Sequence, residues 1–543
     1  MTKTKWARWT VALFFLALTA AGLAMGADYG VPWDEAYEQQ IVQQNLHEYA
    51  VHLLGSDSEA ARWYASRNIP RISQSIERDH GECAYYPVAP LLTALSNQPE
   101  SLRIWWHAYT WLWFMAGVWA LYALCRETGL TRPISCMGAL LLYLCPRFFG
   151  EGHYNNKDMV LLSLVLLTLW LGARFLRRQT PGRGFLLSLA GAMAANTKII
   201  GLFVWGLMGL AAVILVSVKR RWSGRMAATA IGTIASFAAF YALLTPALWP
   251  DAGGFWEYLL TNSTSFTRWH GVVLFRGATF AKHLTPLPWY YIPWMMVLTL
   301  PVYVLPLAAV GQLATVQKVF RQKAAVWASA ESLTLLAASF SWFVPLCYAV
   351  VARPVVYNGW RHFYFVYAGI ALMGAHGIAF LVDFLRRRTG EFGMHRLFAA
   401  GMCLFYLWMA IGIVQNHPYE YAYYNRIERA GAEERLELDY WNVHTLNLLK
   451  ELLADERRNP SLPLEISARD EKSLSGLVQN LPQLEESSRA RLTVSENRDA
   501  PYLYANTTYS RIYGVAPPQG YHELLKVKSY GLVLGVIYEK DAP

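Results

Sequence analysis

The stretch ISCMGALLLYLC-PRFFGEGHYNNKD-MVLLSLVLLTLWLGARF, residues 134–175, contains the two kinds of segment that decide the fold. Two apolar runs lie on either side of a polar turn, 146–158, and basic residues flank the pair at Arg132 and Arg177. An apolar helix of about 20 residues spans a bilayer, and Lys and Arg gather in cytoplasmic loops. The pattern therefore predicts two membrane helices joined by a turn on the non-cytoplasmic side.

The rest of the chain repeats this organisation. Of its 543 residues, 55% are hydrophobic and only 16% are charged, whereas soluble domains carry about 25% charged residues. The net charge of +10 includes short basic groups that close apolar stretches, such as 219–221 and 386–388. We interpret these groups as cytoplasmic anchors and not as a nucleic-acid surface. The six cysteines form no recognisable disulfide framework and include no CxxC pair.

Eleven apolar segments are predicted to be membrane helices. They are residues 11–27, 104–125, 134–149, 158–175, 185–197, 199–218, 226–244, 289–312, 333–351, 363–385 and 397–414. With the N-terminus inside, every short basic loop falls on the cytoplasmic side. The alternative for the first segment is a cleaved signal peptide, because small residues crowd its end. The segments 185–197 and 199–218 are expected to be short helices that meet near Lys198, inside a cavity.

Polar sequence on the predicted outer side falls into two loops, 28–103 and 246–288, and a tail, 417–543. The first loop is predicted to contain a helix over 34–54 and a further surface helix before Pro99. Within the tail, the periodicity predicts a helix over 443–453 and strands over 464–467, 491–495 and 530–538. We therefore expect an all-α polytopic membrane domain, 1–416, followed by a small C-terminal α/β extracytoplasmic domain, 417–543.

Acidic residues are scarce in the membrane portion, and two clusters of them fall at predicted outer ends. Asp34 and Glu35 follow the first helix, and Glu151 and Asp158 flank the turn quoted above. One carboxylate can take a proton from an acceptor hydroxyl as general base, and another can hold the acceptor or a divalent metal. Asp34 and Asp158 are the candidate metal ligands. The alternative for both is helix capping, because an acid near a helix start satisfies free N–H groups.

A lipid phosphate that leaves during a reaction needs cations where its charge develops. The candidates on the same side are Lys157, Lys198, Arg268, Arg276, Lys282, Arg353, Arg361 and His362. Lys198 is the most specific of them, although a lysine that extends to the interface is its alternative interpretation. The chain has no Asp-x-Asp pair, no GxGxxG and no P-loop, so a nucleotide-sugar donor has no visible site.

Taken in order, several stretches resemble the GT-C superfamily of glycosyltransferases, specifically the family 39 type. This family includes the protein O-mannosyltransferases and the aminoarabinose transferases of lipid A. The resemblance covers residues 10–420 and is carried by Asp34-Glu35, 146–158, NTKIIGL at 196–202, LPWYY at 287–291, YNGWRHF at 357–363 and HPYEY at 417–421 followed by DYW at 439–441. It implies a GT-C helical bundle and inverting transfer from a polyprenyl- or dolichyl-phosphate sugar. It also implies that Asp34 is the catalytic base and Asp158 the second acidic position. The outer loops show no β-trefoil-like insert, which puts a protein acceptor in doubt.

We therefore predict a membrane glycosyltransferase that moves a hexosyl or pentosyl group from a polyprenyl phosphate to a lipid, glycan or protein acceptor. The predicted catalytic residues are Asp34, Glu35 and Asp158, and the predicted substrate-binding residues are Glu151, Lys157, Lys198, Arg361 and His362. The expected location is a bacterial inner membrane with the site facing the periplasm, and no nucleic acid is an expected partner. A divalent metal is an open question.

Two alternatives belong to other functional classes. A transporter or flippase for a lipid-linked sugar would place charges near the bilayer midplane and show repeated halves, neither of which is visible here. An oligosaccharyltransferase-like or ligase-like enzyme would move a whole glycan. The Trp-Trp-Asp signature of the oligosaccharyltransferases is absent, because His107 follows Trp105-Trp106.

Overall fold

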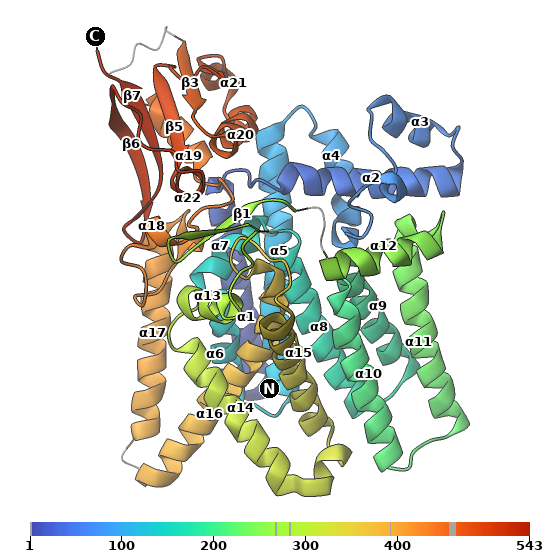
Figure 1. Cartoon of the computed structure of the whole chain (residues 1–543). Helices are drawn as coiled ribbons and strands as arrows, with labels where there is room; N and C mark the ends of the chain where they lie inside the picture. Colours follow the sequence, from blue (N-terminus) through green and yellow to red (C-terminus); the bar gives the residue numbers. More distant parts are fainter. Residues whose placement is uncertain (1–2, 266–268, 282–283, 391–392, 455–462, 543) are drawn as a thin grey trace.

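The computed structural model describes residues 3–265, 269–281, 284–390, 393–454 and 463–542. The long helices run side by side as a bundle, and the C-terminal domain lies at the end of the bundle opposite the N-terminus (Figure 1). The predicted site residues all fall within the described ranges. Of the further candidate cations, Arg268 and Lys282 lie outside them.

A helix is present at each of the eleven predicted membrane segments. In the described part of the chain, eight helices are long and apolar enough to cross a membrane. They are α1 (Lys3–Met25), α5 (Pro99–Glu127), α8 (Asp158–Arg177), α10 (Ile200–Val218), α11 (Gly224–Leu244), α15 (Ala330–Ala352), α16 (Tyr367–Thr389) and α17 (Met394–Asn416). Two bent pairs raise the number to ten: α6 (Arg132–Tyr143) with α7 (Pro146–Tyr154), at 68°, and α13 (Tyr291–Thr299) with α14 (Val304–Gln322), at 113°.

The segment 185–197 forms the short helix that the sequence predicted. Helix α9 (Pro181–Thr197) has 17 residues, fewer than the roughly 20 that a full crossing takes. The described chain therefore has eight to ten candidate crossings, together with one short helix. As predicted, the short helix ends at a break: Lys198 is extended (φ −151°, ψ 138°), and α10 begins at Ile200. A Cβ on Gly201 would come within 2.3 Å of the Ala194 carbonyl carbon, so this close approach requires glycine.

Burial separates the inner helices from the outer ones. The most apolar window of α8 is 78% buried within the protein, whereas those of α1, α11 and α17 are 11%, 17% and 22% buried. The exposed apolar faces of the outer helices are suited to lipid contact. The connections α10–α11 and α16–α17 lie at the end opposite the C-terminal domain (Figure 1). These connections include the basic groups 219–221 and 386–388 or adjoin them, as the predicted alternation requires.

The two outer loops form a layer at the other end of the bundle. The first loop contains α2 (Glu35–Leu54), α3 (Glu59–Ser66) and α4 (Pro90–Ala94), and the second contains α12 (Ala252–Ser265) and a hairpin of β1 (Val272–Phe275) and β2 (Ala278–Ala281). Figure 1 shows α2, α3 and α12 on the same side as the C-terminal domain. The helix predicted over 34–54 is confirmed as α2, and the hairpin was not predicted.

The C-terminal residues fold around a five-stranded sheet of order β4-β3-β5-β7-β6. Its strands are β3 (Leu464–Ala468), β4 (Leu492–Val494), β5 (Tyr502–Asn506), β6 (Tyr521–Ser529) and β7 (Leu532–Lys540), and its helices are α18 (Ala432–Arg435), α19 (Thr445–Ala454), α20 (Glu471–Asn480), α21 (Glu486–Arg489) and α22 (Thr507–Ile512). The three N-terminal strands pair in parallel, and β7 pairs antiparallel with β5 and β6. The predicted α/β composition is confirmed, including α19, β3, β4 and β7, whereas β5, β6 and α20 were not predicted.

Candidate active site

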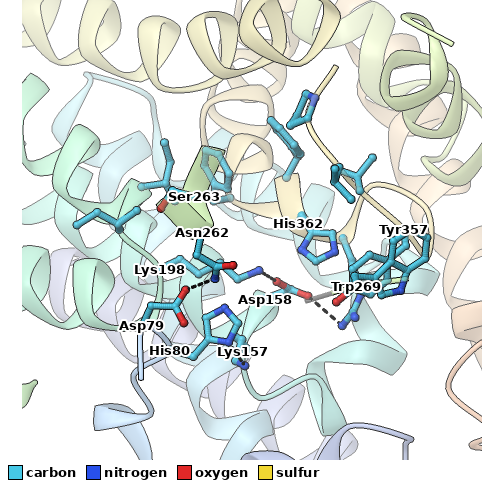
Figure 2. Close-up of a pocket in the computed structure, with 18 of the residues that line it drawn as sticks. Asp79, His80, Lys157, Asp158, Lys198, Asn262, Ser263, Trp269, Tyr357 and His362 are labelled. Carbon is cyan, nitrogen blue, oxygen red and sulfur yellow. Dashed lines mark hydrogen bonds and ion pairs between the residues drawn. The ribbon is translucent and has the colours of Figure 1, made fainter. Parts of the chain in front are cut away.

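A cavity of about 830 Å³ lies where the start of α2, the α9–α10 break, helix α12 and the segment after α15 meet. Six of the eight predicted site residues line it: Asp34, Lys157, Asp158, Lys198, Arg361 and His362. Figure 2 shows several of them pointing toward one another around Asp158. Glu35 and Glu151 are not among the lining residues. The cavity is therefore the place where the two predicted clusters converge.

Arg361 connects the two aspartates across the cavity. Its Nη1 lies 3.0 Å from Asp34 Oδ2 and 3.7 Å from Asp158 Oδ2. Lys198 Nζ donates to the other oxygen of Asp158, Oδ1, as the dashed line in Figure 2 indicates. The result is a continuous chain of alternating charges built from four separate elements.

The two aspartates differ in exposure. The Asp34 side chain is 29% exposed, whereas that of Asp158 is 2% exposed. Asp34 occupies the position before α2, yet its side chain makes no capping hydrogen bond. At the start of α8, Asn155 Oδ1 accepts from the Asp158 N–H at 2.9 Å, so Asn155 satisfies the helix end and the Asp158 carboxylate binds the cations. The capping alternative therefore does not describe either aspartate.

Aromatic rings fix the Arg361 guanidinium. Its Cζ lies 4.9 Å from the ring centre of Tyr357 and 4.7 Å from that of Trp441. Tyr357 in turn stacks on Trp269, with ring centres 4.6 Å apart and planes at 6°. Cation–π contacts of this kind hold a guanidinium by its flat face and leave its edge free to donate. In the described residues, Arg361 Nε and His362 Nε2 are buried and have no hydrogen-bond partner.

Lys157 is held by a cluster of acids that the sequence did not indicate. Its Nζ lies 2.7 Å from Glu38 Oε1, 3.9 Å from Glu82 Oε1 and 3.5 Å from His80 Nδ1. Burial and the adjacent Glu38 raise the pKa of Glu82 well above its ordinary value. Burial also acts to raise the pKa of Glu38, but Lys157 outweighs it and the pKa is lowered overall. The two neighbouring carboxyl groups therefore have pKa values shifted in opposite directions.

Glu35 points away from the cavity. It is 3% exposed, accepts from Gln39 Nε2 at 3.1 Å, and lies 2.8 Å from His107 Nε2 on α5. Its carboxylate therefore faces α5, whereas the Asp34 side chain lines the cavity. The structure thus places the predicted catalytic Glu35 at the α2–α5 contact.

Glu151 lies in a second buried network, also outside the cavity. Its Oε1 accepts from the hydroxyl groups of Tyr364 at 2.8 Å and Tyr440 at 3.2 Å, and its Oε2 accepts from Asn155 Nδ2 at 2.7 Å. Arg147 Nη1 is 3.8 Å from the same carboxylate. These bonds join α7 to the segment 361–366 and to the C-terminal residues, which makes Glu151 a packing residue and not a lining one.

The two further candidate cations that the structure describes, Arg276 and Arg353, also lie elsewhere. Arg353 is exposed in a left-handed turn after α15, and Arg276 Nε lies 3.9 Å from Glu428 Oε1 at the β1–β2 turn. Neither lines the cavity. The cations that do line it lie directly before α8, in the α9–α10 break, after α15 and on α20. The last of these is Lys472, from the C-terminal domain.

One wall of the cavity is apolar. It is formed by the start of α10, with Ile199, Ile200 and Phe203, and by α15, with Val344, Pro345 and Tyr348. Both helices are candidate membrane spans, so the charged floor of the cavity continues into a surface suited to a hydrocarbon chain.

The described residues contain no group of three or more His, Cys, Asp or Glu side chains placed to hold a metal ion. The two candidate ligands, Asp34 and Asp158, have the Arg361 guanidinium between them. Arg361 thus occupies the position that a shared cation would take.

One protein family matches part of the chain. Residues 87–249 match the family model described as dolichyl-phosphate-mannose-protein mannosyltransferase. Over that range the chain is similar to this family of glycosyltransferases, in agreement with the resemblance seen in the sequence. The matched range includes Lys157, Asp158 and Lys198 of the cavity. None of the curated proteins matches the chain.

Three solved structures have a related shape at low sequence identity. ArnT from Cupriavidus metallidurans in the apo state is 10% identical over 98% of both chains, with a TM-score of 0.45. The same protein bound to undecaprenyl phosphate is 11% identical over 99% of this chain and 98% of that one, with a TM-score of 0.43. The apo oligosaccharyltransferase of Archaeoglobus fulgidus is 11% identical over 92% of this chain and 70% of its own, with a TM-score of 0.42.

Proposed function

We propose that the chain transfers a single sugar from a polyprenyl-phosphate donor to an acceptor hydroxyl in this cavity, with Asp34 as general base. The observation that carries the proposal is the Arg361 bridge, which places the exposed Asp34 carboxylate beside a cluster of cations held by Asp158. The matched family model, whose description names a dolichyl-phosphate sugar, supports this class of donor.

The difference in exposure supports different roles for the two aspartates. Asp34 is open to the cavity, and in the described residues its Oδ1 accepts no hydrogen bond. As the acceptor oxygen attacks the anomeric carbon, its proton passes to Asp34. The bond between that carbon and the phosphate oxygen breaks, and its electron pair leaves with the phosphate. Attack from the face opposite the leaving group inverts the anomeric carbon. Asp158 orients Lys198 and Arg361 and takes no proton.

The departing phosphate is assigned to Lys198, Arg361 and His362. A charge that develops in a site with little water is stabilised by donors already fixed in place. The Lys198 ammonium group and the Arg361 guanidinium are held by Asp158, and buried nitrogens of Arg361 and His362 are without partners in the described chain. Lys157 directly precedes Asp158 in the chain and adds a further cationic group to the cavity.

The polyprenyl chain of the donor is assigned to the apolar wall of α10 and α15. This wall continues from the cation cluster into the membrane-spanning part of both helices. A lipid-linked donor can therefore keep its chain in the bilayer while its phosphate reaches the charged floor.

The distribution of basic residues supports a location of the cavity on the non-cytoplasmic side. The connections with or beside the basic groups 219–221 and 386–388 lie at the end opposite the C-terminal domain (Figure 1). Under the positive-inside rule that end faces the cytoplasm. We propose a bacterial inner membrane with the C-terminal domain and the cavity in the periplasm.

The test uses purified protein in lipid vesicles and a panel of isotope-labelled polyprenyl-phosphate sugars, followed by mass spectrometry of membrane lipids, glycans and proteins added as acceptors. The proposal expects one labelled sugar to appear on one acceptor class. Movement of the donor across the bilayer with no labelled product would instead identify a flippase. A product that carries a whole glycan would identify a ligase-like enzyme.

A further inference from the structure

The backbone that leads to Asp34 is bound by the C-terminal domain, more than 400 residues away in sequence. The Val31 N–H donates to Asn480 Oδ1 at 2.9 Å, and Asn480 Nδ2 donates back to the Val31 carbonyl at 3.3 Å. Gln479 Nε2 donates to the Trp33 carbonyl at 3.3 Å, and the Trp33 N–H donates to the Trp441 carbonyl at 2.9 Å. The amide and carbonyl groups of both residues are thus paired with the C-terminal domain.

Helix α20, which contains Gln479 and Asn480, also contacts the side chain of Trp33. Lys472 Nζ lies 3.6 Å from the ring centre, and both residues line the cavity. Lys472, Gln479 and Asn480 belong to α20, and residues spaced by seven and eight positions lie on one face of a helix. Three side chains of one helix face therefore hold two of the three residues that precede Asp34. Figure 1 shows α20 at the side of the C-terminal domain that faces α2.

The fit between the two segments leaves little room for movement. Asn480 is fully buried, and Val31 is 6% exposed. A Cβ on Gly30 would come 2.4 Å from the Val443 carbonyl oxygen and 2.8 Å from Asn480 Oδ1. The segment 30–33 is therefore fixed against the C-terminal domain, whereas the Asp34 side chain beyond it has Arg361 as its partner in the described residues.

We infer that α20 is a positioning element of the transfer site, which fixes the backbone of Val31 and Trp33 so that the Asp34 carboxylate meets the acceptor. We call Lys472, Gln479 and Asn480 the α20 clamp. The inference rests on the proposed role of Asp34. A reacting group displaced by about 1 Å can lose about a hundredfold in rate, so the clamp is expected to act on turnover more than on donor binding.

The test compares Asn480→Ala with Asn497→Ala, a second asparagine of the same domain that touches neither Val31 nor Trp33. Both full-length proteins are assayed in vesicles for kcat with labelled donor, and donor affinity is measured separately by equilibrium binding of the same lipid. We expect Asn480→Ala to lower kcat at least tenfold with donor affinity within twofold of the unmodified protein. Asn497→Ala should change neither quantity.

A second pair of variants decides the question if Asn480→Ala does not fold. Lys472 is only half-buried, so Lys472→Met and Lys472→Arg are expected to be tolerated. Lys472→Met should lower kcat several-fold. Lys472→Arg should keep kcat near that of the unmodified protein, because arginine also stacks on tryptophan. Unchanged kcat in both Asn480→Ala and Lys472→Met would overturn the inference, as would equal losses of kcat and donor affinity. If the unmodified protein transfers no sugar, the proposed function fails instead.

Discussion

Arg361 Nη1 donates to Asp34 Oδ2 at 3.0 Å, and the two residues are 327 positions apart in the chain. The contact fixes one oxygen of the most exposed carboxylate of the charge chain and leaves the other toward the cavity. Because the same nitrogen lies 3.7 Å from Asp158, Arg361 links the proposed base to the cations proposed for the phosphate. One side chain therefore connects the proposed proton acceptor with the proposed leaving-group site.

Replacing Arg361 by lysine keeps the positive charge and removes the planar fork. A lysine ammonium is a point charge that does not stack on Tyr357 and Trp441 in the way a guanidinium does. We expect Arg361→Lys to lower kcat at least tenfold and to weaken donor binding, measured as initial rates and equilibrium binding in vesicles. The matched control is Arg353→Lys, at an exposed arginine outside the cavity. Equal losses in both variants would contradict the bridging role.

Variants of the Lys198–Asp158 ion pair can distinguish an effect on stability from an effect on donor binding. Removing one partner of a buried ion pair costs up to about 3–5 kcal/mol, and the cost here is expected at the lower end because Arg361 remains near Asp158. Lys198→Met should therefore lower thermal stability and weaken donor binding at least tenfold. The double variant Lys198→Met, Asp158→Asn should recover most of the stability and none of the donor binding. The control is Lys219→Met, an exposed lysine at the opposite end of α10.

The outcome of the double variant is decisive for Lys198. Recovery of donor binding together with stability would show that the lysine only neutralises Asp158 and does not bind the phosphate.

Glu151 is expected to matter for folding and not for the reaction. Glu151→Ala removes the acceptor of three side-chain hydrogen bonds in a fully buried network. Each buried donor left unsatisfied costs about 1–3 kcal/mol, so thermal unfolding of the purified protein should occur at a clearly lower temperature. Donor affinity of the folded fraction should stay within twofold. A selective loss of donor affinity at unchanged stability would return Glu151 to the substrate-binding set.

The raised pKa of Glu82 leads to a prediction of how folding stability depends on pH. Burial and Glu38 raise its pKa above the ordinary 4.5. A raised pKa in the folded state contributes stability below pH 4.5 that is lost as the pH rises through the folded-state value. Glu82→Gln remains neutral throughout, so its stability relative to the unmodified protein should increase as the pH rises from 4.5 toward 8. Thermal unfolding of both proteins across this range measures the difference. A difference that stays constant with pH would show that Glu82 is already ionised.

The apolar pattern was sufficient to locate the membrane helices, because each long run of hydrophobic residues became a helix. It was also sufficient to bring Asp34, Asp158, Lys198 and Arg361 together, since each lies at the outer end of such a run. The short helix α9 was also predicted, because its 17 residues end at the polar break around Lys198.

Side-chain direction and long-range pairing could not be predicted in this way. The pair Asp34-Glu35 does not reveal which carboxylate faces the cavity, because that depends on His107 of another helix. Glu38 had a usable signal, since it follows Asp34 by one helical turn, whereas Glu82 is brought to it by tertiary structure alone. The contact between Val31 and Asn480 joins residues 449 positions apart, and no local pattern marks it.

The most direct test of the central claim is the rate of sugar transfer by Asp34→Asn, with Asp57→Asn, an exposed aspartate of the same outer layer, as the control. Asparagine keeps the shape of the side chain but cannot take a proton, and general bases contribute about 10²–10⁴-fold to rates. We predict that Asp34→Asn loses at least a hundredfold in kcat while it binds the lipid-linked donor within threefold of the unmodified protein. Transfer by Asp34→Asn at the rate of Asp57→Asn would contradict the account.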